Sequence, residues 1–286
     1  MNQAAITKVD APARPYVLGH SEQELERLTT QARLIDPITR RFFQAAGIVE
    51  GMRVLDVGSG AGDTAFLTAE IVGLGGEVVG IDRSALAVKA ATARAKNKAL
   101  RNVTFVEGDS AEATFENQFD AVVGRYVLMF QPDAIAMLRK LTKHLHPGGV
   151  VAFHEPESQF FHSFPPVPSY DQCFRWFAET MRLSGADTHM GLKLYSVFVS
   201  AGLPPPTMRL EAGIGGGSSG SDQVRLITDL IHTLLPEIER LGVATAVEVD
   251  IDTLTDRICA EMSGNQSVIV WRGEIVAWSK IEAWKQ

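Results

Sequence analysis

Short apolar runs alternate with helix-like stretches through the middle of the chain, and this alternation restricts the possible folds more than any other feature. Five runs rich in Val, Ile and Phe predict strands at 53–57, 77–82, 103–107, 119–124 and 150–154. Helical spacing of apolar residues predicts helices at about 63–73, 84–99 and 132–145. Strands separated by helices pair in parallel through right-handed crossovers. The pattern therefore predicts a doubly wound α/β sheet of mostly parallel strands.

A leader and two helices are expected before this sheet. Residues 1–15 are small, polar and interrupted by prolines, which is typical of a mobile leader. Residues 16–47 predict two amphipathic cap helices. Ser21 and Glu24 form a capping box at the start of the first, and Asp36-Pro37 is typical of the start of the second.

The predicted core spans residues 48–155, and residues 156–286 complete its sheet. His146-Pro147-Gly148-Gly149 predicts a turn before the fifth strand, and the proline-rich segment 155–168 predicts a loop. Two lid-like insertions are expected at about 156–187 and 214–265. The Gly/Ser stretch 213–221 predicts a flexible linker or lid hinge.

A helical stripe of aromatic residues follows the predicted loop. Tyr170, Phe174 and Phe177 recur on one helical face. Such a stripe packs into a core more often than it contacts a ligand, so core packing is the favoured interpretation over contact with a substrate.

Composition excludes several classes of protein. The 286 residues carry a formal net charge of −7, which argues against a protein that mainly binds nucleic acid. No apolar run reaches the ~18 residues of a membrane span, and no secretory signal is visible. Two cysteines, Cys173 and Cys259, are too few for a disulfide framework or a cysteine zinc site. A cytoplasmic protein without membrane insertion is expected; whether it is a monomer or a homodimer stays open.

The strongest local motif is the run from Val54 to Asp63. A hydrophobic strand leads directly into a turn with glycines at 58, 60 and 62, and the turn opens a helix. Alternating glycines let the backbone turn sharply and leave no Cβ between it and a ligand. A glycine pattern alone is weak evidence, but this one stands at the first strand of the predicted sheet. It therefore predicts a ligand site more strongly than a simple structural turn.

Polar residues end the next three strands. Asp82 ends the second strand and can accept both hydroxyls of a ribose, although a helix N-cap is its alternative role. Asp109 and Ser110 follow the third strand and could bind an adenine amino group. Arg125 follows the fourth strand. The carboxyl ends of parallel strands form the edge at which open α/β sheets bind ligands.

These four elements, in this order and spacing, resemble the class I S-adenosylmethionine-dependent methyltransferases over about residues 40–155. The sequence from Tyr16 to Ser21 and the Pro147-Gly148-Gly149 turn resemble the small-molecule branch near the quinone-biosynthesis methyltransferases. The resemblance implies a Rossmann-like sheet of seven strands, S-adenosylmethionine as cofactor and S-adenosylhomocysteine as product.

The resemblance also implies a place for individual residues around the cofactor. The methionine part of the cofactor is expected to contact Asp56, Gly58, Ser59, Gly60 and Arg125. The ribose is expected at Asp82, and the adenosine and its base at Arg83, Asp109 and Ser110. Tyr16 and Gln31 are expected to close over the bound cofactor.

An NAD(P)-dependent oxidoreductase is the main alternative, because it also combines a glycine turn with an acidic second-strand tip. Its fingerprint is G-x-G-x-x-G, whereas this chain has glycines at 58, 60 and 62 followed by Asp63. An aspartate at the helix start would repel a pyrophosphate, while a sulfonium cofactor tolerates acidic surroundings. A noncatalytic cofactor-binding protein is the second alternative.

Catalytic residues are less well marked than the cofactor site. His154 and Glu155 end the fifth strand and are candidates to take a proton from the methyl acceptor. The alternative for His154 is local packing, and His20 and His162 are weaker candidates. His154-Glu155-Pro156-Glu157 lacks the second histidine of a metal helix, so no metal is expected. The acceptor is expected to be a small, partly apolar molecule rather than a nucleic acid.

Overall fold

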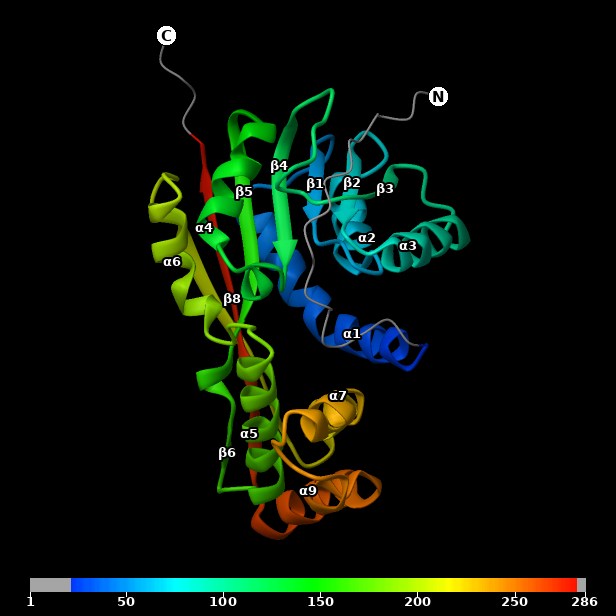
Figure 1. The fold of residues 1–286 in the computed structure, drawn as a ribbon, viewed down its shortest axis with the longest axis vertical. Helices are drawn as coiled ribbons and strands as arrows, with labels where there is room; N and C mark the ends of the chain where they lie inside the picture. The colour runs from blue at the N-terminus through cyan, green and yellow to red at the C-terminus, as the bar shows by residue number, and fades with distance from the viewer. Residues whose placement is uncertain (1–21, 282–286) are drawn as a thin grey trace.

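The computed structural model describes residues 22–281, which form one mixed sheet with helices on both faces (Figure 1). Along the described chain the strands are β1 Arg53–Val57, β2 Glu77–Asp82, β3 Val103–Glu107, β4 Phe119–Arg125, β5 Leu145–Glu157, β6 His162–Phe164, β7 Thr207–Gly216 and β8 Val268–Lys280. The α-helices are α1 Glu22–Ala45, α2 Asp63–Val72, α3 Ala85–Asn97, α4 Ala134–Leu141, α5 Pro168–Leu183, α6 Met190–Ser200, α7 Ser221–Arg240, α8 Ala246–Val249 and α9 Ile251–Asn265.

The first five strands form the parallel half of the sheet, in the order β3-β2-β1-β4-β5. The bounds of β1, β2 and β3 equal the predicted runs and β4 is one residue longer, whereas β5 extends beyond the predicted 150–154 at both ends. Alternate residues of these strands face opposite helical layers: Val54 packs with α1 and α2, and its neighbour Leu55 packs with α4 and α6. Burial on both faces explains why the runs are continuously apolar. The predicted doubly wound α/β fold is confirmed.

The antiparallel half is built around β8. This strand pairs with β5 through residues 273–280, with β6 through 268–270 and with β7 along the opposite side. The described sheet has eight strands, one more than the seven expected, because β6 resumes pairing after β5 has ended. In Figure 1, α5, α7 and α9 surround the far end of this long strand, beyond the carboxyl ends of the parallel strands.

The expectation of two N-terminal helices was wrong. A single helix, α1, continues through Asp36 and Pro37. Proline removes one backbone donor and crowds the preceding turn, which bends a helix more often than it ends one when both halves are packed. The buried side chains of Ile35 and Phe42 hold the two halves against the rest of the protein. Tyr16, His20, Ser21 and the leader 1–15 lie outside the described residues.

Three segments expected to be irregular are partly strand. Residues 146–149 belong to β5, where the register with β4 shifts between Phe119 and Ala121. The segment 155–168 contains the end of β5 and all of β6. The Gly/Ser stretch is no open linker, because residues 214–216 pair with β8 and 217–220 form a 3-10 turn. Glycine and proline predicted turns or loops in these segments, but neighbouring strands supply hydrogen-bond partners for the backbone and keep parts of them in the sheet.

The aromatic face of α5 packs inward, in agreement with the core interpretation. Tyr170 and Phe177 are buried, and Phe174 packs against the same cluster. Phe161 stacks on Tyr170 and on Phe174, with ring centroids 4.6 Å and 4.8 Å apart. These contacts join α5 to the segment between β5 and β6.

Candidate functional site

The glycine turn after β1 leaves an open stretch of backbone at the carboxyl edge of the sheet. Gly58, Gly60 and Gly62 all have positive φ angles, of 63°, 51° and 95°. A Cβ on Gly58 would lie 2.8 Å from Val127, and one on Gly62 would lie 2.7 Å from Phe66. A Cβ on Gly60 would meet nothing within 4 Å. The turn is therefore packed at both ends and open at its centre, where a ligand can approach the backbone.

Asp82 ties the end of β2 to this turn. One of its carboxylate oxygens accepts from the Gly60 amide at 2.9 Å, and the other accepts from the Ser84 amide at 2.8 Å. Ser84, not Asp82, caps α3, because its side chain accepts from the Ala87 amide. Each carboxylate oxygen can accept a second hydrogen bond. Asp82 thus retains acceptor capacity beside the open part of the turn.

Asp56 and Ser59 are polar groups buried under the same turn. Within the described part of the chain, neither carboxylate oxygen of Asp56 nor the hydroxyl of Ser59 has a hydrogen-bond partner. Burial raises the pKa of Asp56 to about 8, and the positive charge of Arg125 and the nearby backbone amide of Ala65, which does not reach hydrogen-bond geometry, only partly offset this effect. Buried polar groups are nearly always hydrogen-bonded, so these atoms are available to a polar or cationic ligand.

The predicted adenosine residues meet at the ends of β2 and β3. Arg83 donates to one carboxylate oxygen of Asp109 at 2.7 Å, and the Ala111 amide donates to the other. Ser110 is buried beside them. Residues predicted from the ends of two strands are therefore brought together, as parallel pairing of β2 with β3 requires.

Arg125 connects the end of β4 to α1. Its guanidinium donates to Asp36 at 2.7 Å and to the Thr39 hydroxyl at 3.1 Å, and its side chain is only 6% exposed. Gln31 is also buried on α1, one turn before Asp36. The N-terminal helix thus lies over the edge at which the predicted residues gather. Tyr16, the other residue expected to close over the cofactor, is not within the described chain.

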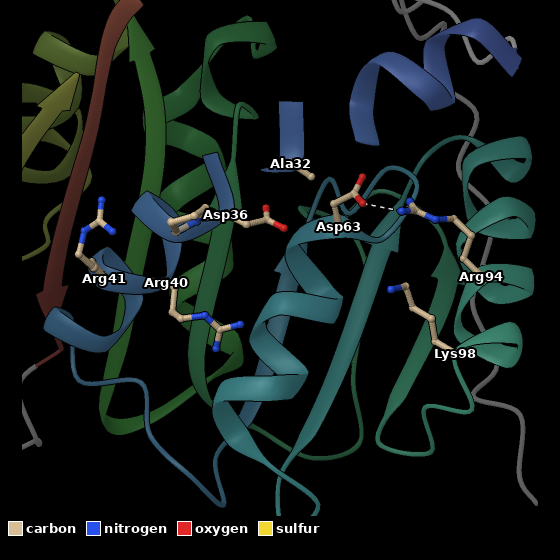
Figure 2. Close-up of a pocket in the computed structure, with 8 residues that line it drawn as sticks. Ala32, Asp36, Arg40, Arg41, Asp63, Arg94 and Lys98 are labelled. Atoms are coloured by element: carbon tan, nitrogen blue, oxygen red, sulfur yellow. Dashed lines mark hydrogen bonds and ion pairs between the residues drawn. The ribbon is translucent and has the colours of Figure 1, made fainter. Parts of the chain in front are cut away.

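A cavity of about 520 Å³ opens between α1, the start of α2 and the end of α3. Its charged lining comes from Asp36, Arg40, Arg41, Asp63, Arg94 and Lys98 (Figure 2). Arg94 donates to Asp63 and to the carbonyl oxygen of Ala61, both at 2.6 Å. This pair fixes the glycine turn to α3, so the cavity lies directly beside the turn.

His154 is fully buried, and both of its ring nitrogens are occupied. Nδ1 lies 3.1 Å from the Thr39 hydroxyl, and Nε2 lies 2.9 Å from a carboxylate oxygen of Glu274. The ring packs edge-on against Phe42. Burial lowers the pKa of His154, although the carboxylate of Glu274 opposes the shift. This geometry favours the local-packing alternative over proton transfer with a ligand.

Glu155 points to the other side of the sheet and anchors a turn. Its carboxylate accepts from the backbone amides of Val127, Leu128 and Met129, at 2.9, 2.7 and 3.3 Å. Burial raises its pKa to about 7 despite these three donors. A carboxylate surrounded by backbone donors supports the segment after β4, and this geometry favours a structural role over a general base.

Three polar residues at this edge escaped the sequence analysis: Tyr126, Arg272 and Glu274. The Tyr126 hydroxyl donates to Glu274 at 2.7 Å, and Arg272 Nε donates to the same carboxylate at 3.1 Å. Burial alone would raise the pKa of Glu274, but Arg272, His154 and Tyr126 together hold it below its usual range. The available signal was a pair of charged residues inside an otherwise apolar β-prone run, 267–279.

Two further properties concern the described residues only. Histidine, cysteine and carboxylate side chains do not gather there into a group able to hold a metal ion. Of the helices present in 22–281, none combines the length and the apolar character that a membrane span needs.

The sheet order, the glycine turn after β1 and the acidic end of β2 define a Rossmann-like class I S-adenosylmethionine-dependent methyltransferase fold. Residues 48–201 match the family described as a methyltransferase domain. Since this match covers more than half of the chain, the protein belongs to that family.

The sequence is also similar to individual methyltransferases. Demethylmenaquinone methyltransferase of Lactococcus lactis is 34% identical over 63% of this chain and 65% of its own length. Aklanonic acid methyltransferase DauC of a Streptomyces species is 37% identical over 42% of this chain and 55% of its own length. The chain thus spans between about half and two thirds of these relatives.

Solved structures share the fold. The YcgJ protein of Bacillus subtilis has a TM-score of 0.51 at 17% identity, covering 82% of this chain and 94% of that one. The [4+2]-cyclase SpnF has a TM-score of 0.50 at 17% identity, covering 87% and 82%. One of these structures is named for a different reaction, so the fold by itself does not specify the chemistry.

Proposed function

We propose that the protein transfers a methyl group from S-adenosylmethionine to a small, partly apolar acceptor. The observation that carries this proposal is the set of unpartnered polar atoms of Asp56 and Ser59 beneath the open backbone of Gly60. A buried carboxylate without a partner suits a ligand that brings a cation and hydrogen-bond donors. The two named relatives, whose printed names concern a quinone and aklanonic acid, support a small-molecule acceptor.

The residues present fit this cofactor. Asp56, Gly58, Ser59 and Gly60 would hold its methionine part, Asp82 its ribose, and Arg83, Asp109 and Ser110 its adenosine end. Arg125 and Gln31 would close the methionine side from β4 and α1. When bound there, the cofactor would supply an electrophilic methyl carbon to an attacking acceptor atom, with the neutral thioether as the leaving group.

The contribution of the chain is alignment and exclusion of water. The helix α1 and the regions 156–187 and 214–265 would wall the acceptor site. With His154 and Glu155 occupied by internal hydrogen bonds, the proposed reaction relies on positioning rather than on a base from β5. Both cysteines are free thiols, which supports the expected cytoplasmic location.

Calorimetry with S-adenosylmethionine and with NAD tests the cofactor. We expect the sulfonium cofactor to bind and NAD not to bind, since Asp63 begins α2 where a pyrophosphate would lie. Tight NAD binding without binding of S-adenosylmethionine would establish the oxidoreductase alternative. Binding of S-adenosylmethionine without methyl transfer to any member of a broad metabolite panel would favour the noncatalytic alternative.

Substitution of Asp82 tests the assignment of the site. Asp82→Ala removes charge-assisted hydrogen bonds and should weaken S-adenosylmethionine binding by about 2 kcal/mol, or roughly thirtyfold in Kd. Glu77→Ala, at the opposite end of β2, is the matched control and should leave Kd unchanged. Equal affinities of the parent and Asp82→Ala would show that the ribose lies elsewhere.

A further inference from the structure

The ladder around β8 is interrupted at Trp271 and Arg272. On β7, Ala212 pairs with Gly273 and Ile214 with Val270, so Gly213 alone lies opposite two residues of β8. On the other side, β5 pairs as far as Gly273 and β6 begins at Val270. Among the described strands, Trp271 and Arg272 therefore have no ladder partner on either side. Such bulges redirect side chains and are frequent beside active sites.

The redirected Arg272 lies against aromatic rings. Its guanidinium carbon is 4.7 Å from the ring centroid of Tyr126 and 5.3 Å from that of Trp271. Nε donates to Glu274, and within the described chain the terminal amino groups meet no second carboxylate. The side chain is 8% exposed. Arg272 is thus a positioned cation with donor groups beyond those its internal partner uses.

Tyr126 links this cation to the cofactor edge. It follows β4 directly, and its φ of 58° is in the left-handed region that non-glycine residues rarely occupy. Hydrogen bonds from its hydroxyl to Glu274 and from its amide to the carbonyl oxygen of His154 hold it there. Its neighbour Val127 packs on the glycine turn at Gly58. Tyr126 thus contacts Arg272 through its ring and directly precedes the residue that packs on the glycine turn.

Buried polar atoms without partners lie at the same interruption. Within the described residues, Trp271 Nε1 and Gln223 Oε1 have none, although the two side chains are only 3% and 9% exposed. Both line the space that a side chain at position 213 would occupy: a Cβ on Gly213 would lie 3.6 Å from Gln223 Nε2 and 3.8 Å from Trp271 Cβ. A donor on Trp271, whose ring lies against the Arg272 guanidinium, and an acceptor on Gln223 therefore remain available at the interruption.

We propose that the interruption of β8 is the acceptor site, and that Arg272 selects an acceptor that carries an ionised oxygen, such as an enolate or a phenolate. This inference rests on the proposed methyl transfer. Tyr126 and Trp271 orient the guanidinium, and Glu274 is a positioning residue that fixes Arg272 and Tyr126 together. An acceptor bound as its anion supplies the attacking electron pair without losing a proton in the site. This explains why His154 and Glu155 are committed to internal hydrogen bonds.

Binding of matched quinones tests the charge preference. The probes are 2-hydroxy-1,4-naphthoquinone, an enol that is ionised at neutral pH, and its neutral 2-methoxy ether, titrated by calorimetry in the presence of saturating S-adenosylhomocysteine. We expect the ionised probe to bind at least tenfold more tightly. Arg272→Met should abolish this preference and leave the affinity for the ether unchanged. Arg209→Met, which removes an exposed arginine stacked on Trp278, should keep it.

Two more variants guard against loss of folding. Arg272→Lys keeps a charge beside Glu274 but loses the planar contacts, and should retain only part of the preference. Gly213→Val fills the space beside Gln223 on an edge strand and should weaken binding of both probes severalfold without lowering the melting temperature. Wild-type protein that fails to prefer the ionised probe, or Arg272→Met protein that keeps the preference, overturns the inference.

The outcomes separate this inference from the proposed function. If S-adenosylhomocysteine binds every variant but the ionised probe is not preferred, the acceptor site is wrong and the cofactor site stands. If S-adenosylhomocysteine fails to bind the wild-type protein, the proposed function is wrong, and the inference falls with it.

Discussion

At the scale of single residues, two buried carboxylates, one on β1 and one on β5, have opposite surroundings. Glu155 accepts three backbone amides, whereas the oxygens of Asp56 have no hydrogen-bond partner within 22–281. Burial raises the pKa of both. A perturbed pKa alone therefore does not identify a ligand site, and the difference lies in which partners the protein already supplies. Glu155 is therefore a structural anchor, whereas the oxygens of Asp56 are available to a ligand.

Substitution of Glu155 tests that distinction. Glu155→Ala leaves three buried N–H groups without an acceptor and should destabilise the protein by about 3 kcal/mol or more, as measured by urea unfolding. Glu155→Gln keeps an amide oxygen for Val127 and Leu128 and should cost less. Full stability of Glu155→Gln together with loss of methyl transfer would instead support the general base first considered for this residue.

At the scale of secondary-structure elements, α1 is attached to the site through side-chain hydrogen bonds. Arg125 bonds to Asp36 and Thr39, and Thr39 also contacts His154, so one helix joins the ends of β4 and β5. Because Pro37 does not end the helix, Gln31 and Asp36 belong to one rigid segment over the glycine turn. Packing of α1 against the sheet therefore also places Gln31 and Asp36 at the proposed cofactor site.

Loss of Asp36 should loosen this helix. Asp36→Ala leaves the buried guanidinium of Arg125 without its carboxylate and should lower the free energy of unfolding by about 2 kcal/mol, less than for a fully buried pair because Asp36 is one third exposed. Faster amide exchange in α1 is the second readout. Glu211→Ala breaks the exposed pair with Arg41 and is the control, with a change within about 0.5 kcal/mol. Equal effects would show that the α1 contact adds no stability.

At the scale of the whole molecule, β8 joins the parallel half of the sheet to the helices α5, α7 and α9. Its thirteen residues pair with β5, β6 and β7, and a single hydrophobic cluster includes Leu55 of β1 and Leu254 of α9. The regions expected to select the acceptor are therefore part of the same cooperative core. The formal net charge of −7 is compatible with a cationic cofactor, but it belongs to the whole chain and does not mark the position of the cofactor site.

The pH dependence of stability should report Asp56. Folding raises its pKa from 3.8 to about 8, so between these values the folded chain holds a proton that the unfolded chain releases. Stability from this group is complete below the lower value and is lost as pH rises toward the higher one. Relative to Asp56→Asn, the parent should lose about 1.4 kcal/mol per pH unit over this window in denaturant titrations.

A bound cofactor supplies the control for this effect. A cation beside Asp56 favours the ionised carboxylate, so saturation with S-adenosylmethionine, which carries a sulfonium and an ammonium group, should flatten the difference between parent and Asp56→Asn. Parallel stability profiles of the two proteins without ligand would show that Asp56 is already ionised in the folded chain.

The sequence by itself determined the parallel half of the sheet and the cofactor edge. The bounds of β1, β2 and β3 follow directly from apolar runs, because strands buried on both faces must be continuously apolar. The glycine turn and Asp82 were visible for the same reason: they are local, and a turn with positive φ angles requires glycine. The glycine turn and Asp82 lie at the same edge of the sheet because β1 and β2 pair in parallel.

Only the tertiary structure decided the roles of groups whose partners are far away in the chain. His154 meets Glu274 across 120 positions, so no local pattern showed that both would be occupied. The continuation of α1 through Pro37, the pairing of the Gly/Ser stretch and the redirection of Arg272 likewise depend on neighbouring elements that supply backbone partners and packing. Local sequence specifies where a strand ends, whereas burial and hydrogen bonding between distant segments specify which side chains remain free for chemistry.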